Sequence, residues 1–379
     1  MRFHWFLPTA VDGRTIATGT KGTLFDGNGG TEATIGTPPR KPSIGYMSSI
    51  AMAAEQAGFD ALLTPVGIRS EDAWVVSSAI AHTTDRIRFL VALRPGMMSP
   101  TLCAAMAATF ERAFPGRLGL NIVLGGDPAE QRMYGDFLQK SERLRRADEF
   151  LAVYNGLMRG ESVTYGGEHI AVEQACIGPG VRNRPEVFFG GSSDGSIDTA
   201  ARRADVYLSW GDTEADIADR AHRFRRAAAA HGRCARVGTR FHVIARDTED
   251  AAWAEAAHLM SGLARDDLDR TIEVLSRSES AGQSRMLSLH ERYRSTGDPQ
   301  DLEVSPGIWA GIGLMRGGAG ASLVGSFATV RAKIAELGAM GIDDFILSGF
   351  PHLEEAWRVG EEIVTPLAEL ERFGTVPHV

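Results

Sequence analysis

Arg240 and His242 are the two side chains whose types and spacing best suit chemistry in this sequence. They stand two residues apart in TRFHVIAR, a run whose apolar character is typical of a buried strand. Successive strand side chains alternate between faces, so both should leave the same face. Inward polar side chains are costly unless they meet a ligand or each other. Because Arg offers a planar fork to oxyanions and His changes charge near neutral pH, the pair predicts an anion site with acid–base capacity; the alternative is a pair that satisfies itself in the core.

A further cation, Arg316, lies in the run GIWAGIGLMRGGAGASLVG, from Gly307 to Gly325. Glycine is unfavourable inside regular elements and tolerates positive φ, so the run predicts a loop that moves or approaches a ligand closely. An Arg on such a loop favours a lid that closes over an anion, although a solvated linker with an incidental Arg would have the same pattern. We expect the segment from about Ala281 to Gly320 to be mobile without substrate.

Gly190, Gly191, Ser192 and Ser193 come between an apolar run and a helical pattern. The glycines let the backbone approach a phosphate, and serine hydroxyls at a helix N-terminus suit an anion. A simple helix N-cap would have the same residues. Trp210 ends the next apolar run, YLSW, where it forms either a rim aromatic of the core or one wall of a ligand pocket.

The elements that must position these groups alternate between short apolar runs and amphipathic stretches. This alternation is typical of a parallel sheet with crossover helices, whose strands are buried on both faces. We expect strands at Arg2–Leu7, Ala61–Thr64, Ile87–Leu93, Leu118–Val123, Val187–Phe189, Val206–Ser209, Arg240–Ala245 and Asp344–Leu347. We expect helices at Tyr46–Ala57, Ala73–Ala81, Pro100–Phe114, Ser141–Met158, Ile197–Arg203, Ala215–His231, Ser326–Met340 and Leu353–Leu370. Eight such units predict an α/β fold, a (β/α)8 TIM barrel, and the lack of a GxGxxG motif after the first run disfavours a doubly wound sheet.

A single domain, 1–379, is expected, because such barrels exceed about 250 residues when they carry insertions. Three segments lie outside the minimal unit. Residues 9–43 should form an inserted loop after the first strand, and Glu161–Arg184 a hairpin before the fifth strand. Residues 264–320 should form a helical insertion and the Gly-rich lid after the seventh strand. The first and last of these follow the carboxyl ends of strands, where barrels place their chemistry.

The composition of the chain excludes some classes of partner and indicates where the protein is located. The formal net charge is −8 without a basic run, which argues against nucleic acid and an anionic membrane as partners. No apolar run approaches the ~20 residues of a membrane span, and the N-terminus lacks a signal-peptide pattern. The 3 Cys and 10 His residues show no disulfide framework or metal-ligand spacing, so no metal is expected. We therefore expect a cytoplasmic protein.

Several motifs follow one another in the order found in one enzyme family. They are HWFLPT near the start, EDAW, FLVALRP, FFGGSSD and SGFPHLEEAWRVGE, together with the Gly-rich run. With them the chain resembles, over nearly its whole length, the two-component FMNH2-dependent alkanesulfonate monooxygenases of the bacterial luciferase-like superfamily. The resemblance implies reduced FMN from a separate NAD(P)H:FMN reductase, dioxygen, and cleavage of an organosulfonate C–S bond into sulfite and an aldehyde. It also implies a homodimer or homotetramer, for which the helices at 73–81 and 100–114 could supply the face.

The resemblance also implies roles for the candidate catalytic residues. Arg240 and His242 would bind the sulfonate and stabilise a flavin peroxide. Arg316 would contribute once the lid closes and excludes water. Trp210 would wall the substrate pocket beside the flavin.

The cofactor would use a further set of residues. The resemblance puts the FMN phosphate against Gly190–Ser193, and Asn121 and Val123, at the end of the fourth strand, near the isoalloxazine. The family has a Tyr that reaches the phosphate where this chain has Leu144. We expect Arg143 or the serines to compensate for that missing contact.

The substrate pocket departs from the family pattern at two positions. Relatives with sulfonate activity often have Cys before EDAW, whereas this chain has Ser70, and they have Tyr where this chain has Phe350. Phe cannot donate a hydrogen bond to a sulfonate, so either another donor replaces it or the organosulfur substrate differs. His352 lies two residues further along, and it is as suited to fixing the turn as to touching substrate.

Three alternatives stay open. The same chemistry could act on a sulfo-sugar or a dialkyl sulfone, which Phe350 and the long first loop favour. A deazaflavin F420-dependent oxidoreductase could use the same barrel without oxygen. A non-enzymatic flavin-binding protein is the third alternative, against which the retention of Arg240, His242 and Arg316 argues. Sulfite release with FMNH2 and O2 would separate the desulfonation hypothesis from the last two.

Overall fold

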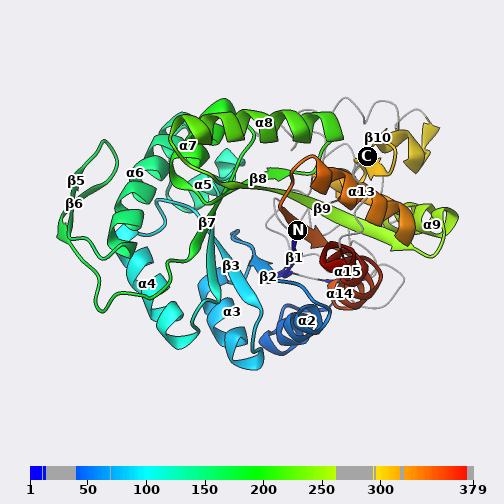
Figure 1. Ribbon diagram of the computed structural model, residues 1–379, viewed down its shortest axis with the longest axis horizontal. Helices are drawn as coiled ribbons and strands as arrows, with labels where there is room; N and C mark the ends of the chain where they lie inside the picture. Colours follow the sequence, from blue (N-terminus) through cyan, green and yellow to red (C-terminus); the bar gives the residue numbers. More distant parts are fainter. Residues whose placement is uncertain are drawn as a thin grey trace.

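The computed structural model describes residues 1–10, 12–13, 40–68, 70–261, 293, 296–315 and 320–373. Eight parallel strands in this part of the chain close into a barrel (Figure 1). They are β1 (Arg2–Phe6), β2 (Ala61–Thr64), β3 (Arg88–Leu93), β4 (Leu118–Ile122), β7 (Glu186–Gly190), β8 (Val206–Trp210), β9 (Arg236–Arg246) and β13 (Asp344–Ser348). The strands neighbour one another in that order, and β13 pairs with β1 to close the ring. The predicted α/β barrel and its eight strands are confirmed.

Helices surround the barrel (Figure 1). They are α2 (Ile44–Gln56), α3 (Ala73–Ile80), α4 (Pro100–Ala113), α5 (Pro128–Met133), α6 (Lys140–Met158), α7 (Asp194–Arg203), α8 (Glu214–Ala230), α9 (Glu249–Met260), α13 (Phe327–Ala339), α14 (His352–Val359) and α15 (Thr365–Phe373). Many begin where the sequence supplies a short polar cap: Ser43 caps α2, Asp72 caps α3 and Ser99 caps α4. The predicted closing helix is interrupted by a π turn, Gly360–Val364, where a Cβ on Gly360 would lie 2.3 Å from that of Ala57. None of the helices in the described ranges is long and apolar enough to cross a membrane.

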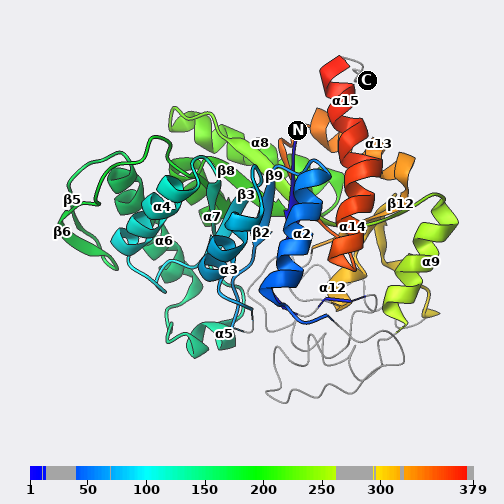
Figure 2. The same cartoon turned by 90° about the horizontal axis from the view of Figure 1, so that it is seen from below.

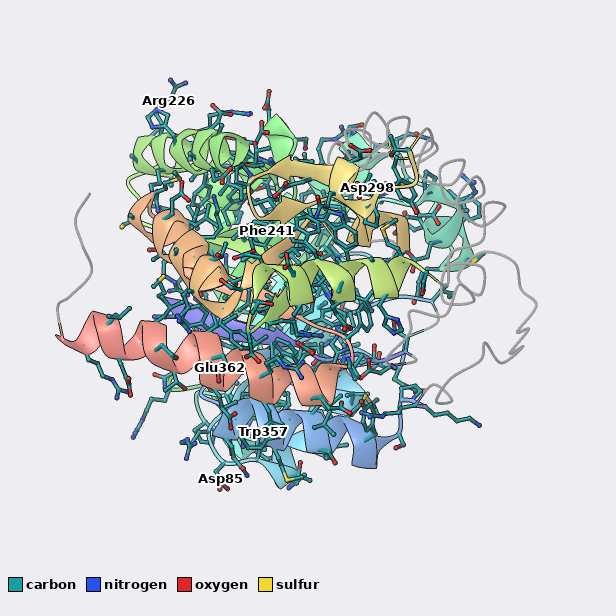
Figure 3. All side chains as sticks on the ribbon, turned by 90° about the vertical axis from the view of Figure 1, so that its right-hand side faces the viewer. Asp85, Arg226, Phe241, Asp298, Trp357 and Glu362 are labelled. Carbon is teal, nitrogen blue, oxygen red and sulfur yellow. The ribbon has the colours of Figure 1, made fainter. Side chains whose placement is uncertain are left out.

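Alternation along the strands divides the barrel interior from the layer under the helices. The interior holds one cluster of apolar side chains: Phe6, Leu63, Leu90, Ala92, Phe188, Val206, Leu208 and Ile346. Phe241, between Arg240 and His242, belongs instead to the large cluster beneath the helices and is fully buried there (Figure 3). The barrel is therefore filled by side chains below its mouth, and inward residues at the strand ends line that mouth.

Charged side chains cover the opposite end of the barrel, where the strands begin. Glu186 accepts hydrogen bonds from Arg236 at 2.8 Å and from Arg2 at 3.2 Å, and Arg88 also pairs with it. Asp344 accepts from Arg236 at 2.8 Å. These pairs join strands across one end and leave the other end for ligands.

The Gly-rich run differs from its prediction as a loop. At its start lies the short strand β11 (Ile308–Trp309), and at its end β12 (Ser322–Ser326), which pairs in parallel with the last part of β9. Between them, α12 (Ile312–Met315) is also described. The loop prediction is therefore wrong at both ends of the run. Its glycines allow close backbone packing, since a Cβ on Gly320 would lie 2.9 Å from the carbonyl oxygen of Gly211.

Most of the helical insertion predicted at 264–320 lies outside the described residues, so its helical character stays a prediction. Residues 296–315 form a 3-10 turn at Pro299–Leu302, β10 (Glu303–Ser305), β11 and α12. Leu302, Trp309 and Ile312 are fully buried in a cluster that they share with side chains of β9, α9 and β12, so this part is packed against the barrel. Arg316 lies outside the described residues. The predicted hairpin before the fifth barrel strand is confirmed as β5 (Val163–Gly166) and β6 (Ala171–Ala175).

Candidate active site

The candidate site lies at the barrel mouth, where the parallel strands end. Figure 2 shows α5 and α12 beside that end. Inward residues at the ends of β8, β9 and β13 form one side of the mouth, those of β3, β4 and β7 form another, and β1 and β2 complete the ring.

Arg240 and His242 face the barrel interior, as their spacing predicts. The Arg240 guanidinium lies 4.4 Å from the ring centroid of Phe6, an interior residue. Nδ1 of His242 lies 3.2 Å from the Ser348 hydroxyl oxygen, and the His242 side chain is 4% exposed. Trp210 stands in register with Arg240 on the neighbouring strand. The structure therefore gathers three of the four predicted catalytic residues in one half of the mouth.

The end of the Gly-rich run, from Gly320 onward, lies beside these residues. His242 donates its backbone N–H to the carbonyl of Ala321 at 3.1 Å, and Ala321 donates to Gly211 at 3.2 Å. A Cβ on Gly320 would lie 3.1 Å from the Cβ of Trp210. The segment that carries Arg316 thus ends against the wall formed by Trp210.

Phe350, which stands where the alkanesulfonate monooxygenases have Tyr, lies beside His242. Its ring centroid lies 5.0 Å from that of His242 and 4.8 Å from that of His352, and the side chain is 7% exposed. His242 therefore contacts both a hydroxyl, that of Ser348, and an aromatic ring. The hydroxyl of Ser348 supplies a polar partner that sequence reasoning did not identify.

His352 is fully buried and is tied to the first loop. Its Nδ1 lies 2.9 Å from one carboxylate oxygen of Asp12, and its backbone N–H donates to the other at 2.9 Å. Tyr46 also donates to Asp12 at 2.6 Å. Burial opposes ionisation of Asp12, but His352 and Tyr46 outweigh it and lower the pKa of that carboxyl. This placement favours the role of His352 in fixing the turn over direct contact with substrate.

The predicted phosphate cradle lies between β7 and α7. Ser193 is the N-cap of α7, and its hydroxyl oxygen accepts from the backbone N–H of Ser196 at 3.3 Å. Gly191 has φ 153°, and a Cβ there would lie 2.6 Å from the Ser196 hydroxyl oxygen. Gly190 and Ser192 are half-buried beside it. The capping interpretation is thus correct for Ser193, and a helix N-terminus that opens at the mouth also suits an anion.

Asn121 and Val123 lie at the end of β4, next to that cradle. Asn121 is 4% exposed, and its side-chain oxygen has no hydrogen-bond partner among the residues that the structure describes. Val123 is half-buried. A buried acceptor without a donor is costly, so Asn121 is suited to a ligand N–H.

Arg143 and Leu144 lie at the start of α6, in contact with neighbouring loops and helices. Arg143 donates to the carbonyls of Leu138 at 2.6 Å and Gly125 at 3.4 Å, so it braces the loop after β4. Leu144 packs on the first turn of α7, where a Cβ on Gly195 would lie 2.6 Å from it. An apolar contact with α7 thus stands where the family has the phosphate-binding Tyr.

Sequence reasoning missed Arg94, which follows β3 in the mouth. One terminal nitrogen donates to Glu130 at 2.7 Å, and the guanidinium lies 5.5 Å from the ring centroid of Tyr134. Glu130 also accepts from the backbone N–H of Ile68 at 3.0 Å, in the turn that holds the half-buried Ser70. The signal in the sequence was an Arg at the end of an apolar run, in ALRP, but a single Arg has no spacing to test.

Known proteins share this architecture. A family model described as luciferase-like monooxygenase matches residues 1–344. A solved riboflavin lyase with modified FMN and riboflavin aligns with a TM-score of 0.75 at 17% identity, over 97% of this chain and 91% of that chain. The EDTA monooxygenase of Chelativorans sp. BNC1 aligns with a TM-score of 0.73 at 18% identity, over 100% and 95%. The coenzyme F420-dependent tetrahydromethanopterin reductase of Methanopyrus kandleri aligns with a TM-score of 0.62 at 17% identity, over 86% and 96%. At these identities the structural likeness shows the fold alone.

Proposed function

Because the chain belongs to the luciferase-like monooxygenase family, we propose that it is an FMNH2- and O2-dependent monooxygenase that cleaves the C–S bond of an organosulfonate, releasing sulfite and an aldehyde. The observation that carries this proposal is the pair Arg240 and His242, which faces inward at the mouth beside Trp210. A guanidinium can bind two sulfonate oxygens, and an imidazole can exchange a proton near neutral pH.

The residues on the other side of the mouth fit FMN. The N-terminus of α7 with Gly190, Gly191 and Ser192 suits the phosphate, and the oxygen of Asn121 suits a ring N–H. When bound, the reduced flavin supplies the electrons that activate dioxygen, and we propose that a separate NAD(P)H:FMN reductase provides it.

The chain's own residues would then act on the substrate. Arg240 binds the sulfonate oxygens, and Arg316 joins it from the Gly-rich run. His242, oriented by Ser348, holds or moves a proton at its imidazole. Trp210 and Phe350 exclude water from the reacting carbon.

We also propose that two or four copies assemble. Val75 on α3 and Leu102 on α4 support this assembly, because their apolar side chains are 66% and 51% exposed on neighbouring helices. Light scattering at micromolar protein concentration tests it, and a monomer would contradict it.

The test of the function is a screen of organosulfonates with chemically reduced FMN, so that no reductase partner is needed. Sulfite is measured in air and under nitrogen. We expect sulfite from at least one sulfonate in air and none under nitrogen. Oxidation of an alcohol or imine with F420 under nitrogen, without sulfite from any sulfonate, would overturn the proposal.

A dialkyl sulfone is the second candidate substrate, and Phe350 favours it. Phe350 puts an apolar ring beside His242 where a phenol would serve an anion. Oxygenation of the carbon next to a sulfone would release a sulfinate and an aldehyde. Product analysis of the same screen, extended to sulfones, distinguishes sulfinate from sulfite.

A further inference from the structure

Arg94 is held rigidly at the mouth by contacts that use only part of its guanidinium. One terminal nitrogen donates to Glu130 at 2.7 Å, and the ring of Tyr134 lies 5.5 Å from the guanidinium carbon. The residue is 7% exposed. Glu130 is itself fixed by the backbone N–H of Ile68 at 3.0 Å, so the orientation of Arg94 is set before any ligand arrives.

The other two nitrogens of the Arg94 guanidinium carry hydrogen atoms that no described residue accepts. Nε and the second terminal nitrogen of Arg94 have no hydrogen-bond partner in the part of the chain that is described. Buried donors without acceptors cost free energy, and charged ones cost the most. A carboxylate or sulfonate oxygen would satisfy these donors with charge-assisted hydrogen bonds.

Arg94 and Arg240 lie on opposite sides of the barrel. Three strands separate β3 from β9 in either direction around the ring, namely β4, β7 and β8 on one side and β2, β1 and β13 on the other. Arg94 lies two residues beyond Ala92, which faces the interior, so alternation directs it inward as well. The mouth therefore carries an inward Arg at each of two opposite points.

We propose that Arg94 binds a second acidic group of the substrate, which makes the substrate class an organosulfonate with a carboxylate or a second sulfonate at its far end. In this arrangement Arg240 holds the sulfonate that is cleaved, and Arg94 holds the other acid across the mouth. The inference rests on the proposed function for the identity of the first acid. It concerns binding, so it can be tested apart from the reaction.

The test compares alkanesulfonates of increasing chain length with α,ω-disulfonates of the same lengths. Dissociation constants are measured by calorimetry on the full-length protein saturated with FMN. For one range of lengths we expect the disulfonate to bind about ten- to hundredfold tighter than the monosulfonate, which is the range that a charge-assisted hydrogen bond supplies. Arg94→Met should remove this preference, with FMN affinity unchanged.

Glu130→Gln is the matched variant, because it removes the carboxylate partner and leaves the donors of Arg94 in place. We expect Glu130→Gln to retain a preference for the disulfonate. Equal binding of mono- and disulfonates at every length, or loss of the preference in Glu130→Gln as in Arg94→Met, would overturn the proposal. So would weaker FMN binding in Arg94→Met, since Arg94 would then serve the cofactor.

The reaction assay separates this inference from the proposed function. Sulfite from monosulfonates without any preference for disulfonates would leave the function standing and refute the second anion site. An Arg94-dependent preference without sulfite from any substrate would support the anion site and refute the reaction.

Discussion

Nδ1 of His242 lies 3.2 Å from the hydroxyl oxygen of Ser348, and its ring centroid lies 5.0 Å from that of Phe350. The hydroxyl hydrogen bond at Nδ1 biases which imidazole nitrogen carries the proton. In this account Ser348 is a positioning residue that acts through His242. This is a local arrangement, and its effect should be confined to steps in which a proton moves.

Replacing Ser348 by Ala should lower kcat and leave the KM for the sulfonate nearly unchanged. The loss of one hydrogen bond, ~1 kcal/mol, corresponds to about a fivefold lower rate. The pH profile of kcat should also shift, since the hydroxyl no longer biases His242. Steady-state sulfite release across a pH series checks both effects.

Ser209→Ala is the control at this scale. Ser209 is a buried β-strand serine on the face of β8 opposite to Trp210, and its hydroxyl has no hydrogen-bond partner within the described ranges. We expect its pH profile to match the wild type. A profile that stays unchanged in Ser348→Ala, or that shifts equally in both variants, would contradict the positioning role.

The junction of β8, β9 and β12 is the element on which the site depends. β9 runs past the end of β8, and β12 pairs with the part of β9 that extends beyond it. Gly211 and Gly320 meet at that junction, beside Trp210 and His242. The backbones approach closely because neither residue carries a Cβ.

Replacing Gly320 by Ala should therefore destabilise the protein and disturb the site together. A Cβ would lie 2.9 Å from a backbone oxygen of Gly211, which cannot move aside as a flexible side chain can. We expect a loss of about 1–3 kcal/mol in the free energy of unfolding, as for other overpacked positions. Urea unfolding with tryptophan fluorescence measures it.

Gly45→Ala serves as the matched substitution, because nothing lies within 4 Å of a Cβ at that position in α2. It should be neutral or slightly stabilising. Equal stability of the two Ala variants would show that the junction tolerates a Cβ and that the glycine at position 320 serves another purpose.

The elements of this fold were predictable to different degrees for physical reasons. Parallel strands buried on both faces are continuous apolar runs, so the eight barrel strands could be located. β12 was missed because SLVGS is short, contains Gly325, and is made a strand by its pairing with β9 and β11. In the site, the spacing of two residues between Arg240 and His242 was enough to predict that both side chains leave the same face of a strand. The partner of His352, Asp12, is 340 positions away, so no local pattern could reveal it.

At the scale of the whole molecule, charged pairs close the end of the barrel opposite the site. Burial would raise the pKa of Glu186, but the hydrogen bonds and charges of Arg236 and Arg88 lower it from 4.5 to about 2. A lowered folded-state pKa contributes stability that is present above pH 4.5 and is lost as the pH falls through about 2. The barrel should therefore depend on this carboxylate across the physiological range and lose its contribution only in strong acid.

Glu186→Gln should reduce the free energy of unfolding by about 1–3 kcal/mol at neutral pH, less than for a fully buried pair. The expected loss is smaller than for a fully buried pair because the Glu186 side chain is 25% exposed, so solvent screens its ion pairs. The difference from wild type should shrink between pH 4.5 and about 2, which urea midpoints at several pH values measure. Glu168→Gln removes an exposed pair with Arg145 and should have almost no effect. A difference between wild type and Glu186→Gln that stays constant with pH would contradict the account.

The most direct test of the central claim is the yield of sulfite per reduced FMN oxidised, in wild type and in Arg240→Met. With a sulfonate substrate, we expect the wild type to release sulfite in proportion to the reduced FMN that it oxidises. The reason is that Arg240 holds the sulfonate where the inward residues of β8, β9 and β13 meet. Arg240→Met should still oxidise FMNH2 but release at least about tenfold less sulfite, since ~1.4 kcal/mol of lost binding is tenfold. An unchanged sulfite yield in Arg240→Met, or no sulfite from the wild type with any organosulfonate, would contradict it.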